Sequence, residues 1–333
     1  MKRFLLKFCI LFTLIWGLIG YFAFIVRPQI SGDMGTLGKI PFGHEYNRRI
    51  ETKHASHGTP IQTIGVEDSI TSSVITIGDS FSQLGACGYN QFLADAIGGD
   101  VINIQQHPYE PEQTFVRLVN NHKIPSGAIV IVETVERALW GRLINLDLQD
   151  SVLIRREKSD KGESISLLDE TLIWLKEILG IKQPIVKFHT RLDLFSHQTR
   201  HNELYIYNSK WVGDGDLLFL EDVANKGLVE QACCNLYNLH EFAENHGIQL
   251  LYLIAADKYD VYSPFIISDH PYNPTLDMLP DETWIINPKP FLQKKVFEEV
   301  KDVYYINDTH WSPIGAKIVA DEIANRLIEE ILK

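Results

Sequence analysis

The sequence lacks several features that would point to common functional classes. Cysteine accounts for only 4 of the 333 residues. No basic cluster of the kind that phosphate binding requires is present, and the formal net charge of −12 argues against a nucleic-acid partner. Low-complexity tracts and internal repeats are absent, and charged residues make up 22% of the chain. These absences leave an ordinary globular fold without nucleic-acid binding as the expectation.

Nothing in the sequence predicts a metal ion or an organic cofactor. The irregular spacing of His44, His54 and His57 is typical of solvated surface histidines. The cysteines at positions 87, 233 and 234 fit no metal-binding spacing. Two interpretations remain open for them: a disulfide between Cys87 and one of the other two in an oxidising compartment, or three small buried side chains.

A single long apolar run stands out, close to the N-terminus. Basic residues precede it, and no charge occurs from Phe8 to Val26, which is about the length that a membrane-spanning helix needs. The charge bias predicts a cytoplasmic N-terminus and an extracytoplasmic, periplasmic remainder. The small-x-small pattern of a cleavage site is missing, which favours an uncleaved single-pass anchor over a cleaved signal peptide. We expect a cytoplasmic stub and anchor over 1–27 and a linker over 28–70.

From residue 71 onward, apolar runs alternate with helical patterns. Such alternation predicts a three-layer α/β/α sandwich around a five-stranded parallel sheet, with strands buried on both faces. The domain covers 71–333 and carries an insertion at 139–227. The expected strands lie near 74–77, 101–104, 128–132, 249–254 and 303–306. The expected helices cover 81–97, 112–122, 228–246 and 313–332, the last with Ser312 as N-cap and Pro313 as its first residue.

The segment Gly78-Asp79-Ser80 ends the first strand of this pattern. A serine at such a corner places its hydroxyl above the carboxyl edge of the sheet, next to the free amides of a helix start. A serine nucleophile and its oxyanion hole need this arrangement. Ser82 is a rival nucleophile, but it lies a turn further into the expected helix. We therefore predict Ser80 as the nucleophile.

A base for this serine is available at the far end of the chain, in Asp308-Thr309-His310-Trp311. A serine hydroxyl needs a base to accept its proton as it attacks, and a carboxylate fixes the tautomer of a histidine base. His310 is the predicted base and Asp308 the predicted orienting carboxylate. The alternative is that Asp308 caps a turn while His310 fills space beside Trp311.

Polar residues follow the other expected strands, where ligands bind in open α/β sheets. Gln105 and Gln106 are candidate oxyanion donors beside the Ser80 backbone amide. Arg137 either positions substrate or forms a buried pair with Glu133 or Glu136 that braces its strand.

Two further residues follow the fourth expected strand. Lys258 and Tyr262 either bind a sugar or an anionic group, or belong to an ordinary loop.

The paired segments Gly78-Asp79-Ser80 and Asp308-x-His310 resemble the SGNH (GDSL-type) hydrolase superfamily, whose sheet is flavodoxin-like. The longer segment Asp308 to Ala316 is similar to the alginate O-acetyltransferase-like branch of that superfamily. The resemblance implies a membrane-anchored O-acetyltransferase that moves acetyl groups onto a polysaccharide through acyl-Ser80. It also implies an acetyl donor supplied by a multipass membrane acyltransferase. Trp311, next to His310, is a further and weaker candidate for substrate contact.

Two other functions remain open from the sequence. One is a carbohydrate acetylesterase with the same triad and water as the acceptor. The other is a non-catalytic protein that binds polysaccharide or an export partner. The insertion at 139–227 contains Tyr205, Tyr207 and Trp211, which either stack on sugar rings or form ordinary core.

Overall fold

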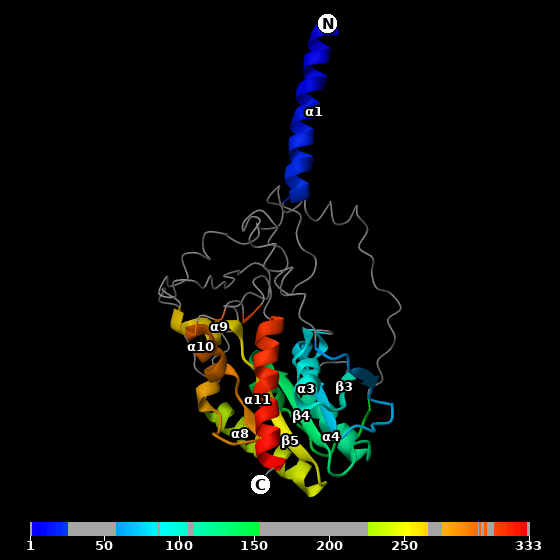
Figure 1. The fold of residues 1–333 in the computed structure, drawn as a ribbon, viewed down its shortest axis with the longest axis vertical. Helices are drawn as coiled ribbons and strands as arrows, with labels where there is room; N and C mark the ends of the chain where they lie inside the picture. Colours follow the sequence, from blue (N-terminus) through cyan, green and yellow to red (C-terminus); the bar gives the residue numbers. More distant parts are fainter. Residues whose placement is uncertain are drawn as a thin grey trace.

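The chain is an α/β protein built on a parallel sheet of six strands (Figure 1). The computed structural model describes residues 2–25, 58–84, 87–105, 110–153, 226–265, 275–298, 300, 303–304 and 310–331. The sheet order is β1-β3-β2-β4-β5-β6, and every pair is parallel. The strands are β1 (Gln62–Gly65), β2 (Val74–Gly78), β3 (Val101–Gln105), β4 (Ile129–Val135), β5 (Gln249–Ala255) and β6 (Ile285–Ile286).

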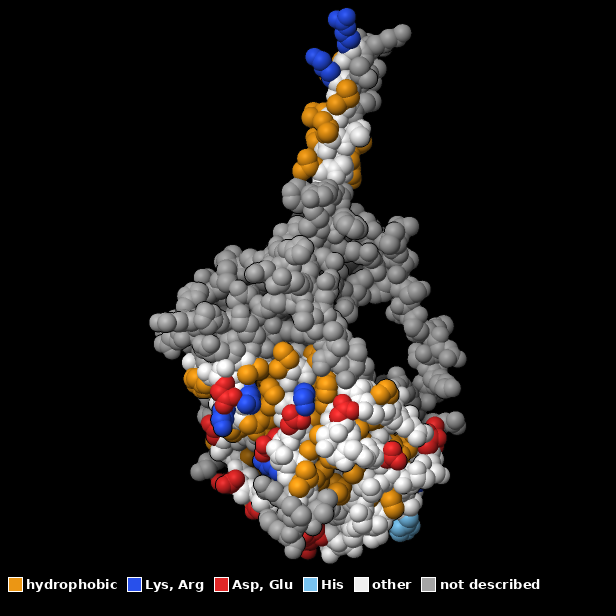
Figure 2. Space-filling model, viewed as in Figure 1, with side chains coloured by type: hydrophobic (Ala, Val, Ile, Leu, Met, Phe, Trp, Pro, Cys, Tyr) orange, Lys and Arg blue, Asp and Glu red, His pale blue; other side chains and the backbone are white. Residues whose placement is uncertain are grey.

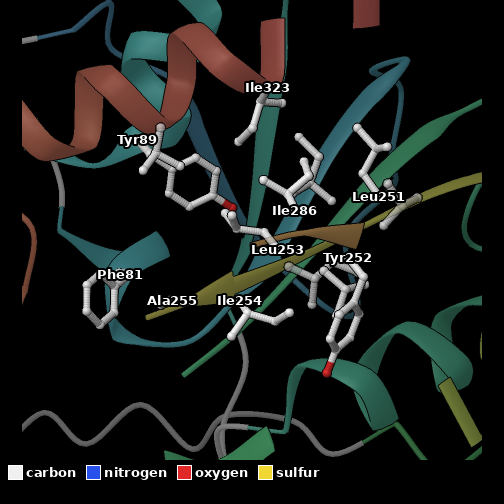
Figure 3. Close-up of a cluster of buried hydrophobic side chains, with 14 of the residues drawn as sticks. Phe81, Tyr89, Leu251, Tyr252, Leu253, Ile254, Ala255, Ile286 and Ile323 are labelled. Carbon is white, nitrogen blue, oxygen red and sulfur yellow. The ribbon is translucent and has the colours of Figure 1, made fainter. Parts of the chain in front are cut away.

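Helices pack on both faces of this sheet. They are α3 (Tyr89–Ile97), α4 (Pro111–Asn120), α5 (Glu136–Ile144), α8 (Lys226–Asn245), α9 (Lys258–Tyr262), α10 (Lys289–Phe297) and α11 (Pro313–Ile331). Helices α3 and α11 pack against each other, as Figure 1 shows. On the other face, Phe115 of α4 meets Phe242 of α8 with ring centroids 6.4 Å apart. Figure 3 shows this division, with Tyr89 and Ile323 on one side of the strands and Tyr252 on the other.

The central strands are buried along their whole length. All five residues of β2 are buried, and so are six of the seven residues of β4. β-branched side chains suit a sheet that is covered on both faces, because both sides of each strand then meet apolar neighbours. The apolar runs that predict these strands therefore arise from burial on two faces.

The first four strands predicted from the sequence are confirmed, and the fifth is wrong. Val303 and Tyr304 form no strand of the sheet; Tyr304 makes an isolated antiparallel bridge with Trp311. The edge position is taken by the two-residue strand β6, which pairs with β5. An apolar run of four residues fits a short strand and any other buried segment equally well, so its pattern could not decide between them.

The sheet also begins earlier in the chain than expected. Strand β1 lies in the segment predicted to be a linker, and it pairs with β3 from Gln62 to Gly65. It makes the sixth strand where five were predicted. Of the predicted insertion at 139–227, residues 154–225 lie outside the described part, and with them the aromatic residues at 205, 207 and 211. His44, His54 and His57 lie outside it as well.

The N-terminal apolar run forms helix α1 (Lys2–Ile25). Figure 2 shows basic side chains at its start and apolar ones along it, where Phe4, Phe8 and Trp16 are exposed. Yet in the described part of the chain, no helix has both the length and the apolar content required to cross a membrane. The structure thus supports the predicted helix but not its predicted role as a membrane span.

The edge strand β6 is covered by a side chain of the last helix. Arg326 of α11 donates from Nη1 to the carbonyl oxygens of Thr283 (3.1 Å) and Ile285 (2.9 Å). Unpaired carbonyls on an edge strand would otherwise be open to another strand. One arginine thus satisfies two acceptors at this edge and ties α11 to the sheet.

Helix α11 begins as predicted. The Ser312 hydroxyl accepts a hydrogen bond from the Ile314 amide at 3.1 Å, which satisfies one of the free amides of the first turn. Gly315 is required in this turn, because a Cβ there would collide with the carbonyl oxygen of Val303 and would lie 3.2 Å from the Cβ of Trp311. The glycine therefore lets α11 start against Val303, next to the Tyr304–Trp311 bridge.

Two glycine-to-alanine variants test this close approach. We expect Gly315→Ala to lower the free energy of unfolding by about 1–3 kcal/mol, because the added methyl overlaps a backbone oxygen. The matched control is Gly141→Ala in α5, where a Cβ meets nothing within 4 Å. That change should raise stability by about 0.5–1 kcal/mol through helix propensity. Urea denaturation of both variants gives the comparison, and equal stabilities would contradict the close approach.

Candidate functional site

The serine corner lies at the carboxyl end of β2, in the interior of the sheet. Strand β2 ends at Gly78, Asp79 is extended, and Ser80 begins a short 3-10 helix that runs to Gln83. Ser80 is half-buried, whereas Ser82 is buried. The single helix expected over 81–97 is therefore wrong, since α3 begins only at Tyr89. The corner leaves Ser80 partly open to solvent at the sheet edge where ligands bind.

A buried glutamate on the neighbouring strand stabilises the serine corner through hydrogen bonds. Glu133 of β4 has no exposed surface, and its Oε2 accepts hydrogen bonds from the Ser82 amide (3.2 Å) and the Ser82 hydroxyl (2.9 Å). The hydroxyls of Ser82 and Tyr89 are also hydrogen-bonded, 3.2 Å apart. Ser82 is thus engaged in holding the turn, which sets it apart from the half-buried Ser80.

Gly78 makes room for this glutamate. Gly78 and Glu133 are register partners in neighbouring strands. A Cβ on residue 78 would collide with the Ser82 hydroxyl and would lie 2.5 Å from Glu133 Oε2. The glycine of the Gly-Asp-Ser segment is therefore needed for the contact between the corner and the strand beside it.

Ionisable groups near the corner affect one another. Burial raises the pKa of Glu133 to about 8, and the negative charge of Asp79 adds to the shift. Arg142 of α5 counters this effect. Its Nη1 pairs with Asp79 Oδ2 and donates to the Thr134 hydroxyl at 2.8 Å. Near neutral pH, Glu133 is thus mostly protonated while Asp79 has an arginine partner.

His310 is brought next to the serine corner. Its ring is buried and lies 4.7 Å from the ring of Phe81, the residue that follows Ser80. Trp311 is fully buried and packs edge-on against the same phenylalanine at 4.6 Å. The predicted base, 230 positions from Ser80 in the sequence, therefore packs on the neighbour of Ser80, while Trp311 belongs to the core.

Of the three other residues predicted for the triad and the oxyanion hole, the structure describes one. Gln105 is the last residue of β3 and is half-buried, so it ends at the same sheet edge as Ser80. Asp308 and Gln106 lie outside the described residues. Their roles as orienting carboxylate and oxyanion donor stay predictions.

A second network of charges follows β4 and β5. Arg137 pairs with Asp257 at 3.0 Å, across the two strand ends. Glu136 Oε2 accepts the Asp257 amide at 2.7 Å. Burial raises the pKa of Glu136 well above its usual value, and a hydrogen bond with the Asp260 carboxyl raises it further. The ion pair of Arg137 is therefore made with Asp257 on the neighbouring strand end, and not with Glu133 or Glu136 as the bracing alternative expected.

Lys258 and Tyr262 are both buried on the short helix α9. The Tyr262 hydroxyl accepts the Tyr304 amide at 3.3 Å. The neighbouring Tyr304 hydroxyl donates to the Ala256 carbonyl at 2.7 Å. Both residues of the predicted sugar-binding pair are thus part of the packing under the end of β5.

A pocket opens beside the corner, between α4 and α5. It has a volume of about 540 Å³, and Arg142, the partner of Asp79, is part of its wall. Glu112 of α4 also lines it, and its Oε1 accepts the Tyr252 hydroxyl at 2.6 Å. Sequence reasoning missed both residues, because each lies inside a helix rather than at a strand end. Charged residues on the buried side of an amphipathic helix were the available signal.

Metal chemistry has no counterpart in the described part of the chain. Among those residues, no group of three or more histidine, cysteine or acidic side chains could hold a metal ion. Cys87, Cys233 and Cys234 carry free thiols, so the buried interpretation applies to Cys87, whereas Cys234 is exposed.

Comparison of the chain with protein-family models, with curated proteins and with solved structures gave no match.

The buried Glu133 predicts a specific pH dependence of stability. Its pKa is raised in the folded chain, so folding favours the protonated form. This contribution is complete below the unfolded pKa and is lost as the pH rises towards about 8. We expect the unfolding free energy of the wild type to fall more steeply with pH than that of Glu133→Gln, by up to about 1.4 kcal/mol per pH unit.

Urea titrations at several values between about pH 5 and about pH 8 measure this difference in slope. Glu230→Gln, which changes an exposed glutamate of α8, is the control and should follow the wild type. Parallel slopes for the wild type and Glu133→Gln would show that Glu133 titrates normally.

Proposed function

We propose that the chain is a serine acyl-transfer enzyme of the SGNH kind, an O-acetyltransferase that acts on a polysaccharide. The observation that carries the proposal is the packing of the His310 ring on Phe81, 4.7 Å away and adjacent in sequence to Ser80. Ser80 and His310, the proposed nucleophile and base, are far apart in sequence, and the ring of Phe81 next to Ser80 brings them into the same region of the fold. Acyl transfer by serine requires this pairing.

The order of the strands supports the same class. Without the edge strand β1, the order β3-β2-β4-β5-β6 places the first strand between the second and the third. This is the flavodoxin-like winding, in which ligands bind at the carboxyl end of the first strand, where the order reverses. Ser80 follows directly from that end of β2.

The proposed reaction has two transfers. The Ser80 hydroxyl attacks the carbonyl carbon of the acetyl donor, and His310 accepts the hydroxyl proton and passes it to the leaving alcohol. His310 then takes the proton of an acceptor hydroxyl, which attacks acyl-Ser80 and releases the serine, to which the proton returns. Asp308 orients His310, and the Ser80 amide with Gln105 or Gln106 stabilises the oxyanion.

The acetyl donor, the acceptor and the cellular compartment are also part of the proposal. An outward-facing membrane enzyme that receives acetyl groups from a multipass acyltransferase follows from the sequence resemblance alone. An acetylesterase with the same residues would pass acetyl to water, so the two candidates differ only in how well the site excludes water and holds an alcohol.

Intact mass measurement of the full-length protein after exposure to p-nitrophenyl acetate tests the nucleophile. We expect one acetyl adduct in the wild type and none in Ser80→Ala, because the attacking oxygen is removed. Ser69→Ala, which alters an exposed serine before β2, is the matched control and should keep the adduct. His310→Gln should form it about 10²- to 10⁴-fold more slowly, because the base is lost.

Two outcomes count against the proposal: an adduct that persists in Ser80→Ala, or a wild type that forms none. A polysaccharide added to the acylated protein then separates the two enzyme functions. Acetyl transferred to sugar faster than it is released as acetate indicates the transferase, and acetate alone indicates the esterase.

A further inference from the structure

The pocket between α4 and α5 is built from side chains that the proposed acyl transfer does not use. Its wall includes Glu112 from α4 and Gly141 and Arg142 from α5. Its volume of about 540 Å³ falls within the range of small-molecule sites. Because Arg142 also pairs with Asp79, the residue before Ser80, the pocket shares a wall with the serine corner.

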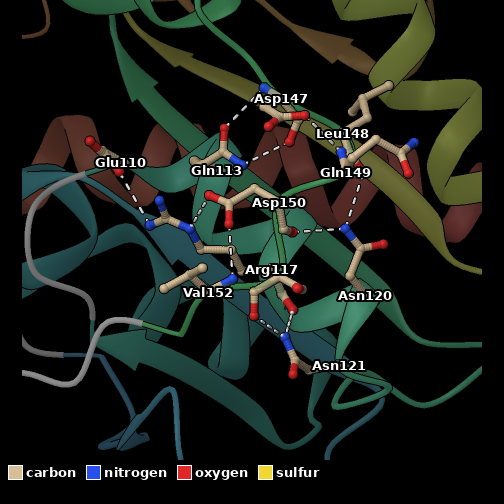
Figure 4. Close-up of polar contacts among 11 residues, drawn as sticks. Glu110, Gln113, Arg117, Asn120, Asn121, Asp147, Leu148, Gln149, Asp150 and Val152 are labelled. Atoms are coloured by element: carbon tan, nitrogen blue, oxygen red, sulfur yellow. Dashed lines mark hydrogen bonds and ion pairs between the residues drawn. The ribbon is translucent and has the colours of Figure 1, made fainter.

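The rim of the pocket is held in place by a network of polar contacts (Figure 4). Arg117 of α4 lies between Asp150, at 2.7 Å, and Glu110, at 3.3 Å. Gln113 and Asp147 are joined through two hydrogen bonds, in which the Gln113 side chain bonds to the backbone of Asp147 at 2.8 and 3.1 Å. The loop that follows α5 is thus fixed to α4, and the pocket is preformed.

The charges of the lining are unbalanced. Four carboxylates face two arginines. Arg117 is paired with Asp150 and Glu110, and Arg142 is paired with Asp79 and also interacts electrostatically with Glu112. An anionic ligand would meet surplus negative charge and no unengaged arginine in this lining. A cation would be attracted by the excess of carboxylates, so the lining favours a positively charged ligand.

One buried atom points to where that charge would bind. Glu112 is 2% exposed, and while its Oε1 accepts the Tyr252 hydroxyl, its Oε2 has no hydrogen-bond partner in the described part of the chain. A buried acceptor without a donor is costly, and a ligand that supplies the donor recovers this cost. An ammonium group offers three donors and a positive charge at once.

We propose that this pocket binds the acceptor of the acyl transfer through a protonated primary amine held by Glu112, so that the acceptor is an amino sugar with a free amine. The identification of the ligand as the acceptor rests on the proposed function. The pocket as an amine site stands on its own contacts. Burial raises the pKa of Glu112, and a bound ammonium would favour the charged carboxylate again.

Binding of monosaccharides to the full-length chain tests the site without any reaction. Glucosamine is the probe, N-acetylglucosamine is the matched neutral ring, and glucuronate is the matched anion, each titrated by calorimetry or ligand-observed NMR. We expect glucosamine to bind at least about tenfold more tightly than either of the others. Glu112→Gln should weaken glucosamine by a similar factor and leave N-acetylglucosamine unchanged.

Gly141→Leu is designed to fill the pocket without harm to the fold. A Cβ at this position meets nothing within 4 Å, and leucine favours a helix over glycine. The variant should keep or raise its melting temperature and lose glucosamine binding. Glu230→Gln on α8 is the control for removal of a negative charge and should bind glucosamine as the wild type does.

Each contrary result overturns the inference: no glucosamine binding by the wild type, equal binding of N-acetylglucosamine or glucuronate, or full binding by Gly141→Leu. The acetyl adduct on Ser80 is read in the same preparations. An adduct without amine binding removes the pocket assignment and leaves the acyl-transfer proposal. Amine binding without an adduct removes acyl transfer and leaves an amine site.

Discussion

The geometry of the serine corner depends on one buried carboxyl group. Glu133 reaches across from β4 and holds both polar groups of Ser82 through one oxygen. A buried acid costs free energy unless it is hydrogen-bonded or neutral. Glu133 is mostly neutral near neutral pH, and one of its two carboxyl oxygens is hydrogen-bonded. The absence of a side chain at Gly78 is what allows the contact. The turn that carries Ser80 is therefore held by residues outside the proposed triad.

Charge at the carboxyl edge of the sheet is arranged in two separate networks. Around Ser80, Arg142 contacts Asp79 and Thr134 and also interacts electrostatically with Glu112 and Glu133. Beyond β5, Glu136 and Asp260 are joined by a hydrogen bond between carboxyls, which requires a shared proton. Buried ionic groups rarely add stability compared with apolar packing. Their concentration at one edge of the sheet is typical of a site where chemistry occurs.

The sequence predicted the layout of the central sheet but not its edges. Long, continuously apolar runs such as those of β4 and β5 have one physical explanation, burial on both faces. The two-residue strand β6 is too short to produce a pattern. The run at 303–306 resembled a strand in sequence, and its two described residues, Val303 and Tyr304, are buried outside the sheet. Helix α11 was predictable because Ser312 and Pro313 act locally, through one hydroxyl and one fixed dihedral angle.

For the site, the sequence predicted which reactive residues lie at the strand ends, but it did not predict which side chains pair with one another. Ser80 and His310 stand out by residue type and position, but the partner of Arg137 is Asp257, 120 positions away. Glu133 was expected to follow its strand, and it lies within β4 instead. Its hydrogen bonds to Ser82 compensate its burial, and they depend on the relative placement of two strands, which no local pattern encodes.

The packing of α3 on α11 has a consequence for how the protein is made. Helix α3 begins at Tyr89, soon after Ser80, whereas α11 begins only at Pro313. During translation the serine corner emerges first, and His310 and the helix that packs on α3 emerge only after the long intervening segment. Contacts so distant in sequence form slowly, because the intervening chain must be closed into a loop first. A chain that stopped before α11 would contain Ser80 without His310 and without the helix that packs on α3.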